Sequence, residues 1–124
     1  MTPTTMLATV SSWALVALGV AHIAFGLVKY RAPLRQAMSE GFVGRFPETG
    51  ARRTAFWFVL FGLPLVLAGH VAVHAAGHGD LALIRVVAAY VFVSSLIGVA
   101  AIPRSPFPLA LLVSVMLALA GCGF

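Results

Sequence analysis

The chain has 124 residues, of which 61% are hydrophobic and 9% are charged. A soluble domain carries about 25% charged residues, and a small one leaves much of its surface in water, so this composition excludes an ordinary soluble domain. The net charge of +5 does not indicate a nucleic-acid partner, because the basic residues gather at the ends of apolar runs, as orientation signals do in membrane proteins.

Four apolar stretches predict four helices that cross a lipid bilayer. They cover residues 7–28, 54–76, 81–102 and 107–124, and a membrane-spanning helix needs about 20 mostly apolar residues. The stretches are too long for the strands of a barrel, and helices satisfy their own backbone hydrogen bonds in lipid. The sequence therefore predicts an all-α integral membrane four-helix bundle that forms one domain, with the first stretch kept as an anchor.

Small and polar residues share one face of the first predicted helix. Gly19, His22 and Gly26 lie three and four residues apart, with Ser12 and Lys29 in the same series. A polar residue in a membrane helix normally faces the bundle interior. His22, near the bilayer centre, is therefore a candidate catalytic residue, acting as a buried acid or base. The alternative is a neutral histidine that only hydrogen-bonds to a neighbouring helix.

The connection after the first predicted helix is the only long one. Apolar residues recur at helical spacing within it: Leu34, Ala37, Met38 and Phe42. Pro33 suits a first helical position and Gly41 a helix terminus, so we expect a short amphipathic helix in the cytoplasmic interface between the first two spans. Two acids of this connection, Glu40 and Glu48, are candidate catalytic acids at the interface.

Basic and aromatic residues open the second predicted helix. This group consists of Arg52, Arg53, Phe56, Trp57 and Phe58. Such a group is typical of an anchor at the membrane interface. The functional alternative is an aromatic lining for an apolar ligand or a carbocation. In that case Arg53, Trp57 and Phe58 are candidate ligand-binding residues.

Three histidines recur at steps of four near the far end of the same helix. They are His70, His74 and His78. Two histidines at this spacing can share a metal ion, but the third follows Gly77, where the helix should end. We therefore favour an interfacial polar cluster in which Asp80 or His74 pairs with Arg85, and we expect neither a metal ion nor an organic cofactor.

The third predicted helix carries a stripe of small and polar residues at steps of four: Tyr90, Ser94 and Gly98. In one interpretation this stripe completes a pocket with His22, which makes Tyr90 and Ser94 candidate ligand-binding residues. In the other interpretation it serves ordinary helix packing.

The basic residues lie mostly on one side of the predicted spans. Those in or beside the first and third connections are Lys29, Arg31, Arg35, Arg45, Arg52, Arg53 and Arg104. Only Arg85 belongs to the opposite side. The positive-inside rule then predicts cytoplasmic first and third connections, and both termini on the non-cytoplasmic side (N-out, C-out).

A series of short motifs lies between residues 13 and 70. The motifs are Gly19-Val-Ala-His22, Gly26, Pro33-Leu34, Gly41-Phe42, Ala55-Phe56-Trp57-Phe58 and Gly62. Here the chain resembles a bacterial family of small four-helix membrane proteins that is known only as a domain of unknown function, and its layout looks like that of the DoxX-like proteins. The resemblance implies a four-helix fold in the bacterial inner membrane and no established activity. DoxX-like proteins include proposed quinone-linked subunits and receptor chaperones.

These features support two hypotheses of function. The leading one is a pocket within the bundle for a lipophilic molecule, such as an isoprenoid, a sterol-like compound or a quinone. An enzyme of this kind would be a cofactor-independent acid/base isomerase or cyclase, with His22 as the buried acid or base, Glu40 or Glu48 as the interfacial acid and Trp57 as the aromatic wall. The alternative is a non-catalytic accessory subunit or chaperone that packs on a larger membrane partner or on a second copy. No acid lies within a span, which argues against a proton-driven exporter.

The orientation is testable with reporter fusions. A reporter that works only in the cytoplasm should be active when inserted near Glu48 and inactive when fused after Phe124, because the basic connections should stay inside. A reporter that works only outside the cytoplasm should give the complementary pattern. Cytoplasmic activity at the C-terminal fusion would contradict the predicted orientation.

Overall fold

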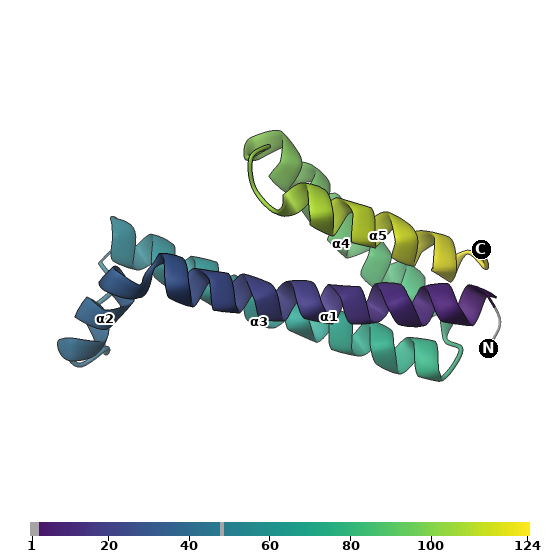
Figure 1. Ribbon diagram of the computed structural model, residues 1–124, viewed down its shortest axis with the longest axis horizontal. Coiled ribbons are helices and arrows are strands. Elements are labelled where there is room, and N and C mark those ends of the chain that lie inside the picture. Colours follow the sequence, from purple (N-terminus) through teal and green to yellow (C-terminus); the bar gives the residue numbers. More distant parts are fainter. Residues whose placement is uncertain (1–2, 48) are drawn as a thin grey trace.

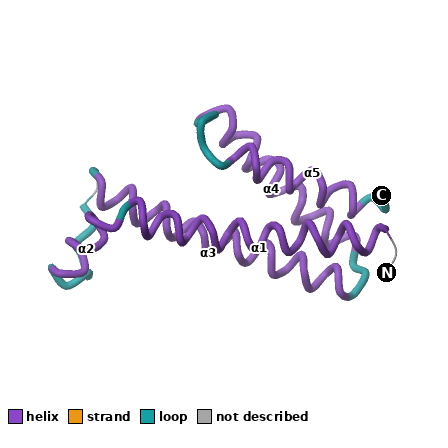
Figure 2. Tube along the Cα trace, in the orientation of Figure 1, coloured by secondary structure: helices purple, strands orange, loops and turns teal. Residues whose placement is uncertain are grey.

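The computed structural model describes residues 3–47 and 49–124, and within these residues the chain folds into helices and connecting turns (Figures 1 and 2). The helices are α1 (Pro3–Lys29), α2 (Arg31–Ser39), α3 (Ala51–Gly77), α4 (Leu81–Ala101) and α5 (Phe107–Gly121). The prediction of an all-α fold is therefore confirmed.

Three of these helices have the length and composition of membrane spans. They are α1, α3 and α4, whereas α5 has 15 residues and is shorter. In the most apolar stretches of the three long helices only 17–28% of the residues are buried inside the protein. Most of their apolar side chains thus face outward, which fits a chain in contact with a lipid bilayer.

Glycines bring α1 and α3 into backbone contact. A Cβ atom on Gly19 would lie 2.8 Å from the backbone nitrogen of Val66, and one on Gly69 would lie 2.6 Å from that of Val16. Small residues let membrane helices approach closely enough for van der Waals packing along the whole contact. The small-residue face predicted on the first helix is thus the face that packs against α3.

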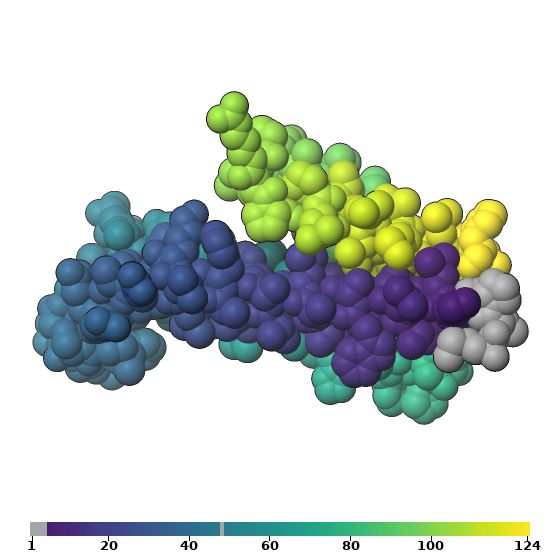
Figure 3. Space-filling model, in the orientation of Figure 1, coloured from purple at the N-terminus to yellow at the C-terminus, as the bar shows by residue number. Residues whose placement is uncertain are grey.

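The α4–α5 hairpin joins the α1–α3 pair at one end only. The largest fully buried side chains of the shared core are Leu15, Ile84 and Leu117, with Ala72 and Ala75 beside them. Figure 1 shows the two helix pairs meeting where both termini lie and diverging toward the other end, and in Figure 3 the tip of the hairpin stands clear of α1. We call the space between the diverging pairs the V-shaped opening.

The short helix predicted in the first connection is present as α2, but its start differs from the prediction. It begins at Arg31, two residues before Pro33, because the first turn of a helix tolerates proline where the backbone N–H lacks an intrahelical partner. Ala37 is buried and Met38 is 64% exposed, so only part of the apolar face packs on the protein. Phe42 lies beyond the helix, at a φ of 66°.

The close packing of α1 and α3 at their glycines predicts how substitutions there change the free energy of unfolding. Gly69→Ala should lower the free energy of unfolding by about 1–3 kcal/mol, because the added methyl group collides with the α1 backbone. Gly77→Ala is the matched control in the same helix. Nothing lies within 4 Å of its Cβ position, so that variant should be neutral or more stable by up to about 1 kcal/mol. Equal thermal unfolding of the two variants in detergent would contradict the close approach.

Candidate functional site

His22 lies against the aromatic residues of α3. Its Nε2 atom is 2.8 Å from the backbone oxygen of Phe58, and its ring stacks on the Phe58 ring with centroids 4.1 Å apart. The edge of Phe61 approaches the same imidazole at 5.9 Å. Gly26, one turn further along α1, makes this arrangement possible, because a Cβ there would lie 2.6 Å from the Phe58 ring.

The hydrogen bond of His22 determines its tautomer. A carbonyl oxygen can only accept, so Nε2 must carry the hydrogen, and in the neutral imidazole Nδ1 is then an unprotonated acceptor. Within the described part of the chain Nδ1 has no hydrogen-bond partner. His22 is only partly buried, so this atom can accept a hydrogen bond or a proton from a bound molecule.

Helical spacing puts His22 on the same side of α1 as residues that are buried at the end where the hairpin joins. Ser11, Leu15 and His22 follow each other at steps of four and seven on one side of α1. Ser11 and Leu15 are completely buried under the shared core, whereas His22 is partly exposed. The side of α1 that is covered at one end is therefore uncovered at His22, where the hairpin has diverged.

The same reasoning applies to α3. Ala75 and Ala68 pack in or against the shared core, and Phe61 and Trp57 continue their series at steps of seven and four. Trp57 is 56% exposed, and Phe61 is also exposed. The structure thus brings Phe58 and Phe61 against His22. Trp57 has a described ring contact with Phe56 rather than with His22, so its role as a ligand-binding residue stays a prediction.

Arg53 and Glu40 have structural partners of their own. Arg53 donates from Nε to the carbonyl of Pro47 at 2.7 Å and from Nη2 to that of Phe46 at 3.1 Å, which fixes the connection before α3. Glu40 forms an ion pair with Arg52, whose guanidinium hydrogen-bonds to the carboxylate and holds the pKa of Glu40 below its ordinary value. A carboxylate held ionised in this way suits an anchor better than a proton donor.

Glu48, the second acid of the hypothesis, lies outside the described residues. Glu40 makes no contact with His22 within the described ranges, so the structure does not join this histidine to an acid there.

Tyr90 and Ser94 lie on the surface of α4, and Tyr90 is 75% exposed. They continue at helical spacing the stripe that begins with Leu83 and Val87 in the core region. Neither contacts His22 in the part of the chain that the structure describes. The pocket that these two residues would complete with His22 therefore stays a prediction. Gly98, the third member of the predicted stripe, instead packs against the Phe107 ring.

The polar cluster after α3 also differs from the expectation. Asp80 caps α4 by accepting from the backbone N–H of Leu83 at 3.0 Å, and Arg85 donates from Nη1 to the carbonyl of Gly121 at 2.7 Å. Arg85 therefore pairs with the end of α5 rather than with Asp80 or His74. The rings of His74 and His78 lie 4.3 Å apart, and the described residues contain no group of three or more metal-ligating side chains.

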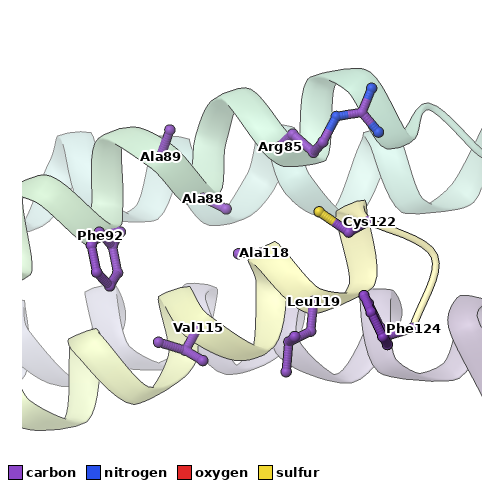
Figure 4. A pocket seen from close by; sticks show the side chains of 9 residues that line it. All are labelled: Arg85, Ala88, Ala89, Phe92, Val115, Ala118, Leu119, Cys122 and Phe124. Atoms are coloured by element: carbon purple, nitrogen blue, oxygen red, sulfur yellow. The ribbon is translucent and has the colours of Figure 1, made fainter.

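Two grooves lie elsewhere on the protein. One, of about 480 Å³, runs between α4 and α5 with Arg85 at one end (Figure 4). The other, of about 210 Å³, includes Trp13 and His70 on the α1–α3 pair. Neither includes His22 or Trp57. Sequence reasoning missed the α4–α5 groove, and its only signal was Arg85, a cation inside a span with no acid on its own helix.

Comparison with known proteins identifies one family. The model of a family described as a family of unknown function (DUF6463) matches residues 6–122. The resemblance to an uncharacterised family is therefore confirmed, and the likeness in layout to DoxX-like proteins stays a prediction. No curated protein and no solved structure matches the chain.

The tautomer of His22 can be measured. Nitrogen NMR of the labelled imidazoles should show a protonated Nε2 and an unprotonated Nδ1 for His22 at neutral pH, because only Nε2–H can bond to the Phe58 carbonyl. Exposed His70, which has no carbonyl partner among the described contacts, should show a mixture of both tautomers. A His22 signal with the proton on Nδ1 would contradict the hydrogen bond.

Proposed function

The chain belongs to the DUF6463 family, whose function is unknown, and we propose that it is a small multi-pass protein of the bacterial inner membrane that binds a lipophilic molecule in the V-shaped opening. The observation that carries this proposal is a histidine with an unused acceptor atom on an otherwise apolar and aromatic wall. The proposed ligand class is an isoprenoid, a sterol-like compound or a quinone.

The proposed topology has four spans with both termini outside the cytoplasm. Both termini lie at one end of the protein and α2 lies at the other, as an even number of antiparallel spans requires (Figure 1). The fourth span, α5, is about 22 Å long at about 1.5 Å per residue, so the bilayer would thin locally around it. Exposed Arg31, Arg35 and Met38 suit α2 to the cytoplasmic interface.

The chemistry of the wall restricts the class of ligand that the opening can bind. Phe61 and Trp57 offer apolar surface, and a neutral imidazole offers one acceptor at Nδ1. A molecule with a large apolar body and a single hydroxyl group matches both features, because its hydroxyl can donate to Nδ1 while its body replaces lipid against the aromatic rings. Isoprenoid alcohols and sterol-like alcohols have this form, and a reduced quinone can donate in the same way from one of its two hydroxyl groups.

A catalytic role would use the same histidine. Nδ1 of His22 can take a proton from such a hydroxyl or from an activated carbon, which is the step that an acid/base isomerase or cyclase needs. A second group must then return a proton. The hydrogen bond from Arg52 lowers the pKa of Glu40, which makes this acid a poor proton donor, and we therefore propose binding as the primary role.

The second candidate is a non-catalytic accessory subunit or chaperone. It is favoured by the open side of the wall, since neither of the two grooves described above includes His22 or Trp57. Gly19, Gly26, Gly62 and Gly69 already pack between α1 and α3, so a partner helix would have to pack on the large apolar residues of the opening instead. Both candidate functions therefore use the same site, which would hold a small molecule in one case and a helix of a partner in the other.

The two candidates differ in what purifies with the protein. Mass spectrometry of the protein purified in mild detergent should show one bound lipophilic alcohol, and Trp57→Ala or His22→Leu should lower its amount by about 10-fold, because each removes a contact worth about 1–1.5 kcal/mol. Trp13→Ala is the matched control, since Trp13 and Trp57 are each 56% exposed. Trp13 lies on α1 outside the opening.

Equal loss of the ligand in the Trp13 and Trp57 variants would place the ligand outside the opening. A protein that carries no lipophilic molecule but retains a stoichiometric membrane partner, lost in Trp57→Ala, would support the accessory subunit and contradict the ligand site.

A further inference from the structure

The groove between α4 and α5 has the form of a site for one hydrocarbon chain. Its volume of about 480 Å³ falls within the usual range of small-molecule sites, about 300–1,000 Å³. Ala89 and Phe92 line it from α4, and Val115 and Leu119 line it from α5 (Figure 4). All four side chains are partly exposed, so the groove is open along its length to whatever surrounds the hairpin.

A cation lies at one end of this apolar groove. Arg85 and Phe92 mark its two ends in Figure 4, and at about 1.5 Å per residue they are separated by roughly 10 Å along α4. Gly121 gives the arginine room to cross the end of α5, because a Cβ there would lie 2.7 Å from Cγ of Arg85. Nη1 then donates to the Gly121 carbonyl, at the negative end of the α5 dipole.

The charge of Arg85 is not neutralised by an acid within the described ranges. Of the acids there, Glu40 pairs with Arg52 and Asp80 accepts from the Leu83 backbone. The guanidinium carries five N–H donors, and its described hydrogen bonds use one nitrogen. Arg85 is exposed, so its remaining donors are accessible to an anion from outside the chain.

We propose that the α4–α5 groove binds an anionic phospholipid, with its phosphate on Arg85 and one acyl chain along the groove. Arginine matches phosphate oxygens with parallel N–H donors, and the apolar walls take a hydrocarbon chain. Arg85 lies four residues after the first residue of α4, Leu81, and so lies close to one end of the proposed span. In the proposed topology the lipid belongs to the outer leaflet.

This site differs in chemistry from the V-shaped opening. Arg85 can only donate and carries a positive charge, whereas His22 offers an acceptor to an uncharged hydroxyl. The groove is also open to the bilayer, so an acyl chain reaches it by lateral diffusion without displacing a helix. The proposal therefore does not depend on the ligand of the opening.

Native mass spectrometry of the full chain tests the proposal. The protein is exchanged into a neutral detergent and titrated with phosphatidylglycerol or, separately, with phosphatidylcholine of the same chains. We expect preferential binding of phosphatidylglycerol, weakened about 10-fold by Arg85→Gln because a charge-assisted hydrogen bond is lost. Arg104→Gln is the matched control: Arg104 is exposed in the connection at the other end of the hairpin and does not line the groove.

A second pair of variants fills the groove and keeps the charge. Ala89→Phe should weaken phosphatidylglycerol binding, whereas Ala100→Phe, on the same helix outside the groove, should not. If Arg85→Gln fails to fold, as judged by its thermal unfolding, the Ala89 and Ala100 pair decides the question.

Several results would overturn the proposal. They are equal binding of the two phospholipids, an equal effect of Arg85→Gln and Arg104→Gln, and undiminished binding to the Ala89→Phe variant. A titration with oleate separates the sources of the anion. Arg85-dependent binding of oleate without binding of phosphatidylglycerol would mean that the groove binds a free carboxylate. The proposal of a phospholipid ligand would then be wrong.

Discussion

The backbone contact between α1 and α3 is the constraint on which the rest of the structure depends. Gly19 and Gly69 have no side chain that could hold the two helices apart, and lipid offers no hydrophobic force that would otherwise press them together. Van der Waals packing must supply the association, and it does so only where the backbones approach closely. The pair therefore forms the base to which the α4–α5 hairpin attaches.

The attachment of the hairpin at one end follows from the distribution of small residues. Alanines such as Ala72 and Ala75 allow close packing in the shared core, where Leu117 of α5 is fully buried. Toward the other end the corresponding α3 positions are Phe61 and Trp57, whose bulk is incompatible with the same close approach. The V-shaped opening thus follows from the change along one stripe of α3 from alanine at one end to aromatic residues at the other.

Polar groups inside the spans are satisfied by the backbone rather than by acids. His22 uses the Phe58 carbonyl and Arg85 uses the Gly121 carbonyl. In each case a glycine leaves room for the contact. Gly26 lies against the Phe58 ring on which His22 stacks, and Gly121 lies against the side chain of Arg85. Each group retains unused capacity, an acceptor in one case and charged donors in the other, and this remaining capacity is the basis of the two binding proposals.

The sequence by itself determined the helical class, the positions of the helices within a few residues, and the face of α1 that packs through glycine. These properties follow from local composition and periodicity, since lipid forces backbone hydrogen bonds into helices. The resemblance to an uncharacterised family was also visible in the short motifs around His22 and Trp57. Periodicity gives the direction of a side chain around its own helix but not the angle between helices.

Only the tertiary structure decided which of these residues meet. It placed His22 on Phe58 and left Tyr90 and Ser94 on a diverging surface. It also paired Arg85 with the Gly121 carbonyl at the end of α5, which is 36 residues away in the chain. Asp80 and His74, which are closer in the sequence, are not its partners. The physical reason is that the crossing of the hairpin depends on the volumes of side chains from several helices at once, and no single stripe of one helix contains that information.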